Sequence, residues 1–475
     1  MRRGNGWYGA DAAQIDALFK AYDVRGLAPD ELTPEITYAI GRAMVASLDL
    51  DEVAVGRDMR VSGPALSAAL IDGIRDQGAN VTDIGLVSTD ALYFVVGRFG
   101  FSAGVMVTAS HNPATYNGLK ICREDARALS LTSGLAEIRD LVLQGSPPIV
   151  DGQRGTLKRQ DMVDPYVDHV LRLVDTANIK PLKIGVDAGN GMAGLTIPRI
   201  FRHLPCTIVP LYFELDGTFP NHEANPLEPE NVEELQQVVL REKCDLGVAF
   251  DGDADRMFLI DERGRFISGD MVTAMVAGKL LERDPGAAVV YNLICSRAVP
   301  EIIARLGGRP VRSRVGHSYI KETMRAEDAV FGGEHSGHFY FRDNWYADSG
   351  MIALLIVLEL ISEADCPLSE ILRPLDQYVR SGEINSDVVN PNATMQGVEA
   401  FYEGTASTID HLDGVTIEFS DWWFNLRPSN TQPLLRLNVE AEDTETLNRK
   451  TNEVLGLIRS MPDATSRMHH QTVTV

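Results

Sequence analysis

The sequence predicts an α/β fold, with three similar α/β domains built on mixed sheets and a C-terminal α+β domain, arranged around one central cleft. Three observations lead to this prediction. Apolar, strand-like runs alternate with helical patterns over most of the chain. The chain has 475 residues, too many for a single hydrophobic core. After Pro367 the pattern changes, because long strand-like segments then precede a helix.

The first domain is expected over residues 1–160. A strand over 52–56, a helix over 63–78 and a strand over 81–85 give it the strand–helix–strand order of an α/β unit. The apolar run over 103–107 supplies a further buried strand.

The second and third domains are expected over residues 161–265 and 266–375, and both repeat this alternation. In the second domain the predicted strands are 182–186, 206–213 and 246–250, and the predicted helices are 192–203 and 232–241. In the third domain the predicted helices are 270–281 and 297–306, and the predicted strands are 287–291, 311–315 and 329–331. The C-terminal domain, residues 376–475, has predicted strands over 415–419 and 434–439 and a predicted helix over 444–461.

In each α/β domain one apolar strand runs directly into a polar motif. The motifs are 108–113 (TASHNP), 251–256 (DGDADR) and 333–338 (GEHSGH). Ligands of open α/β sheets bind at the carboxyl ends of the strands. The three loops are therefore expected to face one cleft.

The composition is that of an ordinary globular protein, with 44% hydrophobic and 23% charged residues. The net charge of −23 argues against nucleic-acid binding, which depends on clustered lysine and arginine. It does not exclude a small phosphorylated ligand, since one pocket can be locally basic. The five cysteines are widely spread without a CxxC pair, as in a reducing compartment. No run of 18 apolar residues and no signal-peptide-like stretch is found, so we expect a cytoplasmic protein without membrane contact.

The serine motif is the most informative of the three. Pro113 lacks an N–H group and keeps Asn112 out of the helical region, so the segment is expected to form a fixed loop. Ser110 follows a buried strand and precedes His111, a position that suits a nucleophile or a phosphoryl acceptor. The alternative is that Ser110 caps a helix and a turn follows it.

The second motif brings three carboxylates together within five residues. Asp251, Asp253 and Asp255 would repel one another unless a cation lay among them. A hard divalent ion suits oxygen ligands, and Mg²⁺ fits if phosphate or water completes its octahedral shell. The three aspartates are therefore predicted to form a metal site.

Two other interpretations suit the aspartates less well. The run resembles the start of an EF-hand loop, and Glu262 falls at its twelfth position, but Arg256 stands where that loop needs glycine. The flanking segments are also strand-like rather than helical. A haloacid-dehalogenase-type phosphatase or mutase would use Asp251 as its nucleophile, but that motif expects Thr or Val at Asp255.

A further motif, residues 426–433 (LRPSNTQP), lies between two strand-like runs. It offers a guanidinium, two hydroxyls and amides, which together suit a phosphate dianion. Its candidate binding residues are Arg427, Ser429, Asn430 and Thr431. The alternative is an ordinary polar hairpin loop.

The third domain motif alternates Glu334, Ser336 and His338 around Gly337. A carboxylate that accepts hydrogen bonds from adjacent hydroxyls is a usual way to hold a sugar. The alternative for His338 is a structural histidine with satisfied hydrogen bonds.

Several cationic side chains stand close to these motifs. Arg25, in 22–26 (YDVRG), is a candidate for contact with a phosphoryl group, whereas 56–60 (GRDMR) equally suits a structural ion pair. Lys120 follows the serine loop closely enough to serve the same site. The backbone N–H groups around His317, between a strand and a helix, could face an anion.

With these motifs in order from Tyr22 to Pro433, the chain closely resembles the α-D-phosphohexomutase superfamily, in particular its bacterial phosphomannomutase/phosphoglucomutase branch. The resemblance implies that Ser110 is a phosphoserine and that the three aspartates hold Mg²⁺ with one of its oxygens. It assigns sugar recognition to Glu334, Ser336 and His338, and the non-reacting phosphate to Arg427, Ser429, Asn430 and Thr431. It places Tyr22, Arg25, His111, Lys120, Arg256 and His317 in the cleft, with Arg25, Lys120, Arg256 and His338 among the catalytic residues.

The resemblance implies reversible conversion of mannose 6-phosphate and mannose 1-phosphate, with the glucose phosphates as possible further substrates. Phosphorylated Ser110 would form a hexose 1,6-bisphosphate, which turns around and returns its other phosphate; the bisphosphate would also prime the enzyme. Lys120 or His338 is the candidate general base. A C-terminal phosphate clamp that opens would give the intermediate room to turn.

Three positions depart from the pattern of this branch. His335 stands where Met is frequent, Ile294 takes a position that often holds lysine, and Asp90 replaces a common Pro. These differences leave the preferred sugar open, and phosphoglucosamine mutase or another phosphohexomutase is the alternative. Further alternatives are an aspartyl-phosphate enzyme using Asp251 and a phosphosugar-binding protein without catalysis. A monomer or weak homodimer with a phosphosugar as its small-molecule partner is expected.

Overall fold

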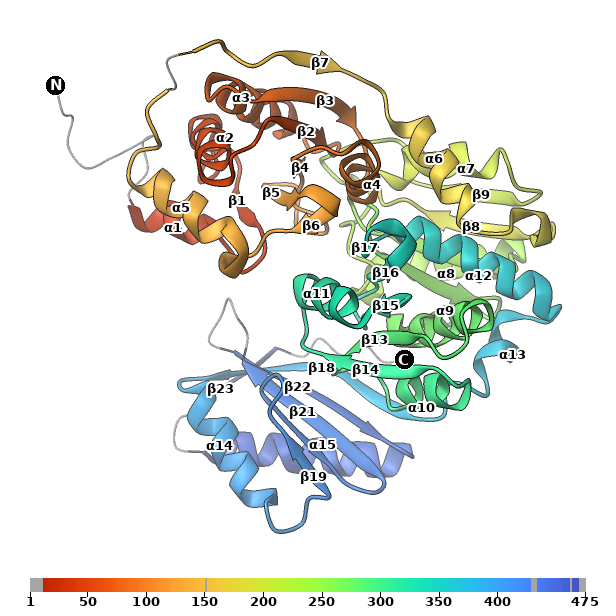
Figure 1. The fold of residues 1–475 in the computed structure, drawn as a ribbon. Coiled ribbons are helices and arrows are strands. Elements are labelled where there is room, and N and C mark those ends of the chain that lie inside the picture. Colours follow the sequence, from red (N-terminus) through yellow and green to blue (C-terminus); the bar gives the residue numbers. More distant parts are fainter. Residues whose placement is uncertain (1–11, 150–151, 429–433, 462–463, 470–475) are drawn as a thin grey trace.

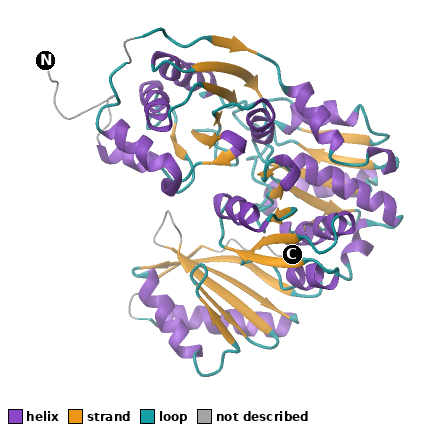
Figure 2. Ribbon diagram, viewed as in Figure 1, coloured by secondary structure: helices purple, strands orange, loops and turns teal. Residues whose placement is uncertain are grey.

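The computed structural model describes residues 12–149, 152–428, 434–461 and 464–469, which fold around four separate β-sheets. The first three sheets are mixed and are interleaved with helices, whereas the fourth is antiparallel. The sheets follow one another along the chain, as the colours of Figure 1 show, and helices accompany each of them (Figure 2). The predicted fold class is confirmed; the exact domain boundaries stay a prediction.

The first sheet has the strand order β1-β5-β4-β2-β3-β7, with β6 beside β5. Its strands are β1 (Val24–Leu27), β2 (Glu52–Arg57), β3 (Asn80–Leu86), β4 (Ala103–Val107), β5 (Tyr116–Arg123), β6 (Arg127–Ala128) and β7 (Leu157–Arg159). The α-helices of this part are α1 (Ala12–Leu18), α2 (Pro34–Leu48), α3 (Gly63–Asp76), α4 (Thr89–Phe99) and α5 (Ala136–Leu143). Strands β2, β3 and β4 are parallel, and β4 and β5 are antiparallel, so the serine motif joins β4 to a hairpin partner.

The second sheet has the order β12-β11-β10-β8-β9. Its strands are β8 (Lys183–Asp187), β9 (Thr207–Leu211), β10 (Leu246–Phe250), β11 (Met257–Asp261) and β12 (Phe266–Ile267), accompanied by α6 (Val163–Arg172), α7 (Ala193–Phe201) and α8 (Glu233–Glu242). Strand β10 is fully buried and pairs in parallel with β8 and antiparallel with β11. The aspartate motif is the connection between β10 and β11.

The third sheet repeats this plan in the order β14-β13-β15-β16-β17. Its strands are β13 (Ala288–Asn292), β14 (Arg309–Ser313), β15 (Phe331–Gly333), β16 (Phe339–Phe341) and β17 (Ala347–Asp348). Its helices are α9 (Gly269–Arg283), α10 (Ala298–Arg305), α11 (His317–Glu327), α12 (Gly350–Ala364) and α13 (Leu368–Leu372). The 333–338 motif connects β15 to β16, at the place equivalent to that of the aspartate motif.

The fourth sheet has the order β19-β20-β21-β22-β18-β23. Its strands are β18 (Val379–Val388), β19 (Thr408–Asp410), β20 (Val415–Glu418), β21 (Trp422–Pro428), β22 (Leu434–Ala441) and β23 (Ala464–His469), and its helices are α14 (Pro391–Tyr402) and α15 (Thr444–Ser460). An antiparallel sheet packed on two helices is the predicted α+β domain.

The hydrophobic core shows how tightly the parts are joined. One continuous cluster includes Phe94, Tyr166, Ile197 and Met275, and so runs through the first three sheets. The C-terminal sheet has a cluster of its own around Phe424 and Leu437, packed on α15. The first three parts therefore form one body, to which the fourth is attached mainly through β18 and polar contacts.

The predicted elements agree with the observed ones within a few residues. The predicted strand over 246–250 coincides with β10, whereas that over 311–315 is β14, which begins at Arg309. Helix α12 was not predicted, because twelve of its fifteen residues are buried and it has no polar face to give a helical period. No helix in the described ranges is long and apolar enough to cross a membrane.

Candidate active site

Ser110 lies in a tight loop directly after β4. Its backbone has φ of 51°, its amide donates to Thr108 Oγ1 at 2.9 Å, and the residue is 1% exposed. The Oγ donates to Asp251 Oδ2 at 2.6 Å and lies 3.2 Å from His111 Nδ1. Ser110 does not cap a helix, so this alternative from the sequence is not what the structure shows.

Arg60 holds the serine loop from beneath. Its guanidinium is fully buried and donates to the carbonyl oxygens of Ser110 at 2.8 Å and Asn112 at 2.6 Å, and also to those of Pro113 and Tyr116. Buried Asp58 lies 3.3 Å from its Nε. The 56–60 motif thus forms the structural ion pair that its sequence allowed. Arg60 positions the serine loop and does not line the cavity.

The three aspartates follow β10 in one buried turn. Candidate ligand oxygens of Asp251, Asp253 and Asp255 lie within 4.8 Å of one another. Burial, together with the charges of the two neighbouring carboxylates, raises the pKa of Asp251 well above its ordinary value. A side chain on Gly252 would lie 2.6 Å from the Ser110 carbonyl oxygen, so glycine is what lets the two loops touch.

Lys120, on β5, inserts its ammonium group between two of these carboxylates. Nζ lies 2.7 Å from Asp253 Oδ2 and 2.5 Å from Asp255 Oδ2. Burial alone would lower the pKa of Lys120, but the carboxylates raise it above the ordinary value. Burial raises the pKa values of Asp253 and Asp255, but Lys120, with Thr89 at Asp253 and His338 and Arg256 at Asp255, outweighs burial and lowers both. With these carboxylates as its partners, Lys120 is a cation.

The aspartate turn also fits the predicted Mg²⁺. Asp253 Oδ1 and Asp255 Oδ1 are buried and accept no hydrogen bond from the described part of the chain. Buried carboxylate oxygens of this kind are the hard donors that Mg²⁺ prefers. Ser110 Oγ hydrogen-bonds to Asp251, the third carboxylate of this turn, so a phosphate on this serine would lie close to the same ion.

In the 333–338 motif, Glu334 is a buried hub. Its carboxylate accepts hydrogen bonds from Tyr340 Oη at 2.6 Å and from the Gly316 amide at 3.2 Å, and lies 3.4 Å from His338 Nδ1. Burial opposes its ionisation, but His338 and Tyr340 outweigh that effect and lower the pKa of Glu334 to about 2. Glu334 is therefore a carboxylate at every working pH.

His338 connects this motif to the aspartate turn. Its Nδ1 lies 3.1 Å from Ser336 Oγ, and its Nε2 accepts a hydrogen bond from Arg256 Nε at 3.2 Å. The same Nε2 lies 3.7 Å from Asp255 Oδ1, and the backbones of Arg256 and His338 form a β-bridge. The sugar motif and the metal motif are thus one continuous surface.

The first and third parts meet where Tyr22 packs against His317. The two ring centroids are 5.2 Å apart, edge to face, and His317 begins α11. Burial and the charge of Lys321 lower the pKa of His317 to about 4, so the ring is neutral near pH 7. On the other side of the loop, Arg25 donates to Asn112 Oδ1 at 2.5 Å.

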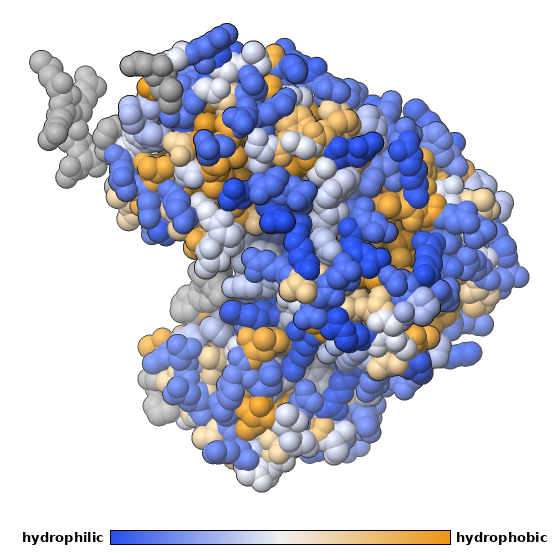
Figure 3. Space-filling view, in the orientation of Figure 1, coloured by the Kyte–Doolittle hydropathy of each residue, from blue (hydrophilic) through white to orange (hydrophobic). Residues whose placement is uncertain are grey.

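A cavity of about 670 Å³ lies where these loops meet. The predicted site residues that line it are Tyr22, Arg25, Ser110, His111, Lys120, Asp255, Arg256, His317 and His338. Asp251, Asp253, Glu334 and Ser336 each contact one of these lining residues. Figure 3 shows a hollow between the N-terminal and C-terminal parts of the molecule, with hydrophilic residues around it. The serine, aspartate and 333–338 motifs therefore converge on one polar cavity.

The structure adds three lining or supporting residues that sequence reasoning missed. Asp348 and Tyr93 line the cavity, and Asp348 pairs with buried Lys321 at 2.6 Å. The Lys321 ammonium group lies 4.1 Å from the centre of the Tyr93 ring. None of the three belongs to a recognisable motif, so only their proximity in space reveals them.

The phosphate motif of the C-terminal domain is described in part. Arg427, on β21, is 7% exposed and pairs with Glu383 at 2.7 Å, outside the cavity described above. Ser429, Asn430 and Thr431 lie outside the described residues. Of the predicted site residues, Arg427 is the one that the described structure does not bring to the serine loop.

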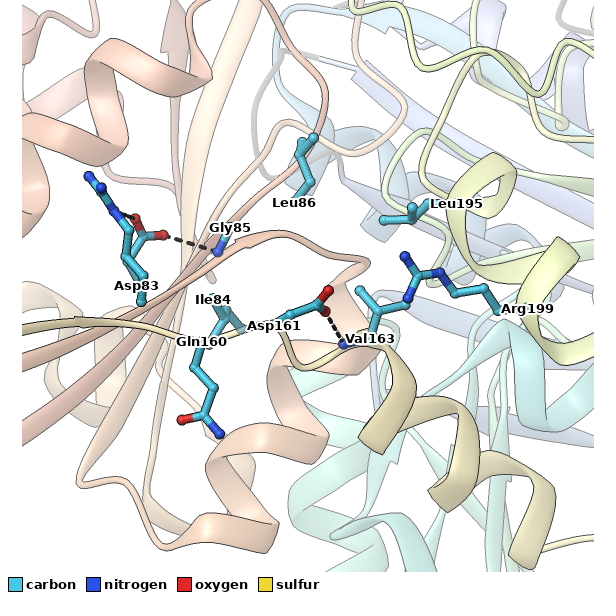
Figure 4. A pocket seen from close by; sticks show the side chains of 10 residues that line it. Asp83, Ile84, Gly85, Leu86, Gln160, Asp161, Val163, Leu195 and Arg199 are labelled. Atoms are coloured by element: carbon cyan, nitrogen blue, oxygen red, sulfur yellow. Dashed lines mark hydrogen bonds and ion pairs between the residues drawn. The ribbon is translucent and has the colours of Figure 1, made fainter.

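A second hollow, of about 440 Å³, lies at the end of β3 beside α7 (Figure 4). Its charged groups serve the backbone and one another, since Asp83 accepts from the Gly85 amide at 3.0 Å and Asp161 from the Val163 amide at 2.9 Å. No predicted site residue lines it. We therefore place the active site in the larger cavity.

Comparison with known proteins agrees with this geometry. Models of the four domains of phosphoglucomutase/phosphomannomutase match the chain in order: domain I at residues 16–146, domain II at 164–264, domain III at 268–378 and the C-terminal domain at 383–457. The chain belongs to the phosphoglucomutase/phosphomannomutase family.

Members of this family resemble the chain over nearly its whole length. A phosphomannomutase of Salmonella montevideo is 42% identical over 450 residues, covering 93% of this chain and 99% of the relative. Phosphohexose mutases of Xanthomonas campestris are 43% identical over 443 residues, with the same coverage. A crystal structure of a phosphoglucomutase/phosphomannomutase family protein from Burkholderia thailandensis has a TM-score of 0.86 at 32% identity, covering 94% of this chain and 98% of that one.

Two of the departures from the family pattern have structural surroundings of their own. Asp90 is buried at the start of α4 and accepts hydrogen bonds from Ser88, Tyr166 and Ser349, so it ties together three parts of the chain. His335 Nδ1 is buried and makes no hydrogen bond to the described residues. For Ile294, nothing in the structure explains the substitution.

Proposed function

We propose that this protein interconverts mannose 6-phosphate and mannose 1-phosphate, with the glucose pair as further substrates, by phosphoryl transfer through Ser110. The observation that carries the proposal is the contact of Ser110 Oγ with Asp251 at 2.6 Å, at the wall of a cavity that also contains Lys120, Arg25 and His338. Phosphoryl transfer needs position and charge neutralisation more than covalent machinery. The relatives' names supply the mannose substrate.

The donor half of the site combines the serine loop with the aspartate turn. Asp251, Asp253 and Asp255 would hold Mg²⁺, which supplies charge neutralisation at the phosphoryl oxygens. Lys120 and Arg256 add two fixed cations beside the same turn. Arg60 fixes the backbone of Ser110, so its Oγ is presented without a change of loop structure.

In the transfer, the bond between phosphorus and Ser110 Oγ breaks while a sugar hydroxyl forms a new bond to phosphorus. The hydroxyl proton must pass to a base. Lys120 is held as an ammonium ion by two carboxylates and has no free electron pair for this task. His338 lines the cavity, and Glu334 beside Nδ1 would stabilise the imidazolium ion after proton uptake. We assign His338 as the general base, with Nε2 taking the proton once Arg256 Nε has turned from it to the phosphoryl group.

The remaining recognition roles divide between two domains. The Glu334 carboxylate would accept hydrogen bonds from sugar hydroxyls, and the Ser336 hydroxyl would donate one to them. Arg427, with Ser429, Asn430 and Thr431, would hold the phosphate that is not reacting. The hexose 1,6-bisphosphate formed in the first transfer would turn around and present its second phosphate to Ser110, and catalytic amounts of it would prime the enzyme. The separate core of the C-terminal domain supports a clamp that can open for this turn.

Turnover of mannose 1-phosphate in a coupled assay, with Mg²⁺ and a trace of glucose 1,6-bisphosphate, tests the proposal. Glucose 1-phosphate and glucosamine 1-phosphate on the same preparation establish the preferred sugar. We expect mannose 1-phosphate to be turned over, and Ser110→Ala to lose at least a thousandfold in activity while it keeps the wild-type unfolding midpoint. A Ser110→Ala variant that retains activity would contradict the proposal, and faster turnover of glucosamine 1-phosphate would replace the substrate.

The chemistry of the phosphoprotein gives an independent test. Phosphoserine survives acid, whereas an aspartyl phosphate at Asp251 does not. We expect mass spectrometry to find an acid-stable phosphate on Ser110 after incubation with the bisphosphate.

We also propose that the protein acts in the cytoplasm as a monomer or weak dimer. The five cysteines are all free thiols, which is consistent with a reducing compartment.

A further inference from the structure

Two arginines lie side by side on neighbouring strands of the C-terminal sheet. Arg427 on β21 and Arg436 on β22 are direct partners in the antiparallel register, so their side chains leave the same face of the sheet. Like charges placed directly opposite destabilise a sheet unless an anion lies between them. The position of Arg427 at the start of the predicted phosphate motif makes this pair a natural site for a ligand anion.

Glu383 supplies that anion from a third strand, β18. Its Oε2 lies 2.7 Å from Arg427 Nη2, and its Oε1 lies 3.3 Å from Arg436 Nη1, so one carboxylate bridges both guanidinium groups. A local irregularity aims it there: the β18–β22 register shifts between Arg380 and Glu383, and Gly382 within the shift has φ of 67°.

Burial and exposure suggest how firmly each group is fixed. The Arg427 side chain is 9% exposed, and its buried Nε makes no hydrogen bond to the described residues. The Glu383 side chain is 27% exposed and that of Arg436 is 31% exposed. Arg427 is therefore fixed in the sheet, whereas Glu383 has room to move towards solvent.

A phosphate dianion can bridge two guanidinium groups as a carboxylate does. It would compete with Glu383 for the same donors, and because both are anions they would repel each other at this distance. We propose that Glu383 is an exchangeable internal counter-ion of a two-arginine clamp, with Arg436 as its second arm, and that it sets how tightly the non-reacting phosphate is held. This inference rests on the phosphate-binding role proposed for Arg427.

Such an exchange suits a reaction in which the clamp must release one phosphate and accept another. When a phosphate leaves, Glu383 returns, so the buried Arg427 is never left without an anion. Release of the intermediate's phosphate therefore avoids the cost of an unpaired buried charge. Without Glu383 the clamp would hold phosphate more strongly and let it go more slowly.

The test uses Glu383→Gln, which keeps the shape and removes the charge. Calorimetric titration with glucose 1,6-bisphosphate is made in the Ser110→Ala background, so that no phosphoryl group is transferred. Glu383→Gln is expected to lower the dissociation constant by about three- to tenfold, because one competing charge is removed. Arg436→Gln is expected to raise it by about tenfold. In the otherwise unaltered enzyme, Glu383→Gln should lower kcat and the inhibition constant of inorganic phosphate together.

Glu403→Gln is the matched control, because Glu403 is exposed at the end of α14 in the same domain and gives the same change of net charge. Affinity of Glu383→Gln equal to or weaker than that of this control would overturn the inference. If Glu383→Gln does not fold, Glu383→Asp keeps the charge with a shorter reach and is expected to tighten binding by a smaller factor; weaker binding by Glu383→Asp would overturn the inference as well. Binding without turnover in the unaltered enzyme would instead contradict the proposed function.

Discussion

Ser110 owes its position to residues that never touch a ligand. Arg60 donates to four carbonyl oxygens of the serine loop and its hairpin, and buried Asp58 neutralises it. The left-handed backbone of Ser110 persists because these contacts over-determine the loop. The position of the Ser110 hydroxyl therefore depends on Arg60 and Asp58, which hold its loop.

The first prediction concerns this support. Arg60→Ala leaves the Asp58 carboxylate buried without its cationic partner, so we expect the free energy of unfolding to fall by about 3–5 kcal/mol and the activity to fall at least tenfold. Urea denaturation and the coupled assay measure the two effects. Arg159→Ala is the control, because Arg159 is 81% exposed and pairs loosely with Asp83, so its removal should change stability by less than about 1 kcal/mol. Equal stability of the two variants would contradict the supporting role.

Asp90 leads to a prediction on pH dependence. Burial outweighs its three hydroxyl donors and raises the pKa of Asp90 to about 7 from 3.8. The folded state therefore binds this proton more tightly than the unfolded state, so its contribution to stability is complete below pH 4 and is lost as the pH rises towards 7. Asp90→Asn carries no charge, so its stability relative to wild type should increase between pH 5 and pH 8. Thermal midpoints of both proteins over this range measure the difference; a constant difference would show that Asp90 is ionised throughout.

At this scale the sequence predicted some roles and missed others. Ser110 and the three aspartates stand out because their types and spacing are unusual within a few neighbouring residues. Lys120 was a candidate base in the sequence, but its charge state depends on Asp253 and Asp255, which lie far away along the chain. Asp348 and Lys321 are single residues without a motif, so no local pattern points to them.

Among the elements, the turn between β10 and β11 depends most on its charges. Asp251, Asp253 and Asp255 share one buried turn, and burial together with the other two carboxylates raises the pKa of Asp251. We predict that saturating Mg²⁺ raises the thermal midpoint by a few degrees, since an ion that binds only the folded state stabilises it. Asp253→Asn should lose this response, and removal of Mg²⁺ with EDTA should abolish activity reversibly. Differential scanning fluorimetry with NaCl at matched ionic strength is the control; an equal response in Asp253→Asn would contradict the metal site.

Some helices with one polar face were predicted closely, but α6 and α14, which also have exposed faces, were not predicted. Helix α8 alternates buried and exposed positions and was predicted within one residue at either end. Helix α12 is apolar almost all round, because it packs against α6, α9 and β11, and so it has no helical period of polar residues that the sequence could show. Strand pairing was also beyond the sequence, since register is decided by contacts between distant segments.

The whole molecule combines a rigid body with one attached domain. The C-terminal domain has its own core, and Arg297 at the start of α10 reaches it through hydrogen bonds to the carbonyl oxygens of Phe419 at 2.8 Å and Trp422 at 3.3 Å. Its amide donates to Glu440 at 2.9 Å. These contacts help to set the angle between the clamp and the rest of the site, together with the Arg380–Asp270 ion pair at 3.1 Å and the hydrogen bond from the Val315 amide to Asp413 at 3.1 Å.

We predict that Arg297→Ala loosens this domain without unfolding it. KM for mannose 1-phosphate should rise by about three- to tenfold, with a smaller change in kcat, and small-angle scattering should give a larger radius of gyration. Arg305→Ala, an exposed residue on the same helix, is the matched control. Unchanged scattering and KM in Arg297→Ala would show that other contacts fix the angle.

At the scale of the molecule, the sequence predicted three α/β domains from their alternating strands and helices, and a different C-terminal domain because the pattern changes after Pro367. How the domains sit together could not be predicted, since that arrangement rests on a shared core whose residues come from several domains. The hydrogen bond between Ser110 and Asp251 forms because that core holds their two domains together. It could not be predicted from either motif alone.

The close approach at Gly252 also limits how such an enzyme can be changed. A Cβ atom added at position 252 would lie only 2.6 Å from the Ser110 carbonyl oxygen in the neighbouring loop. The backbone of one loop therefore cannot change its conformation unless the other changes too. A new hexose preference therefore has to be introduced on the opposite wall, among the residues that face the ring or the distant phosphate. An engineer who seeks a mutase for a different sugar should leave the seam between the first two domains intact.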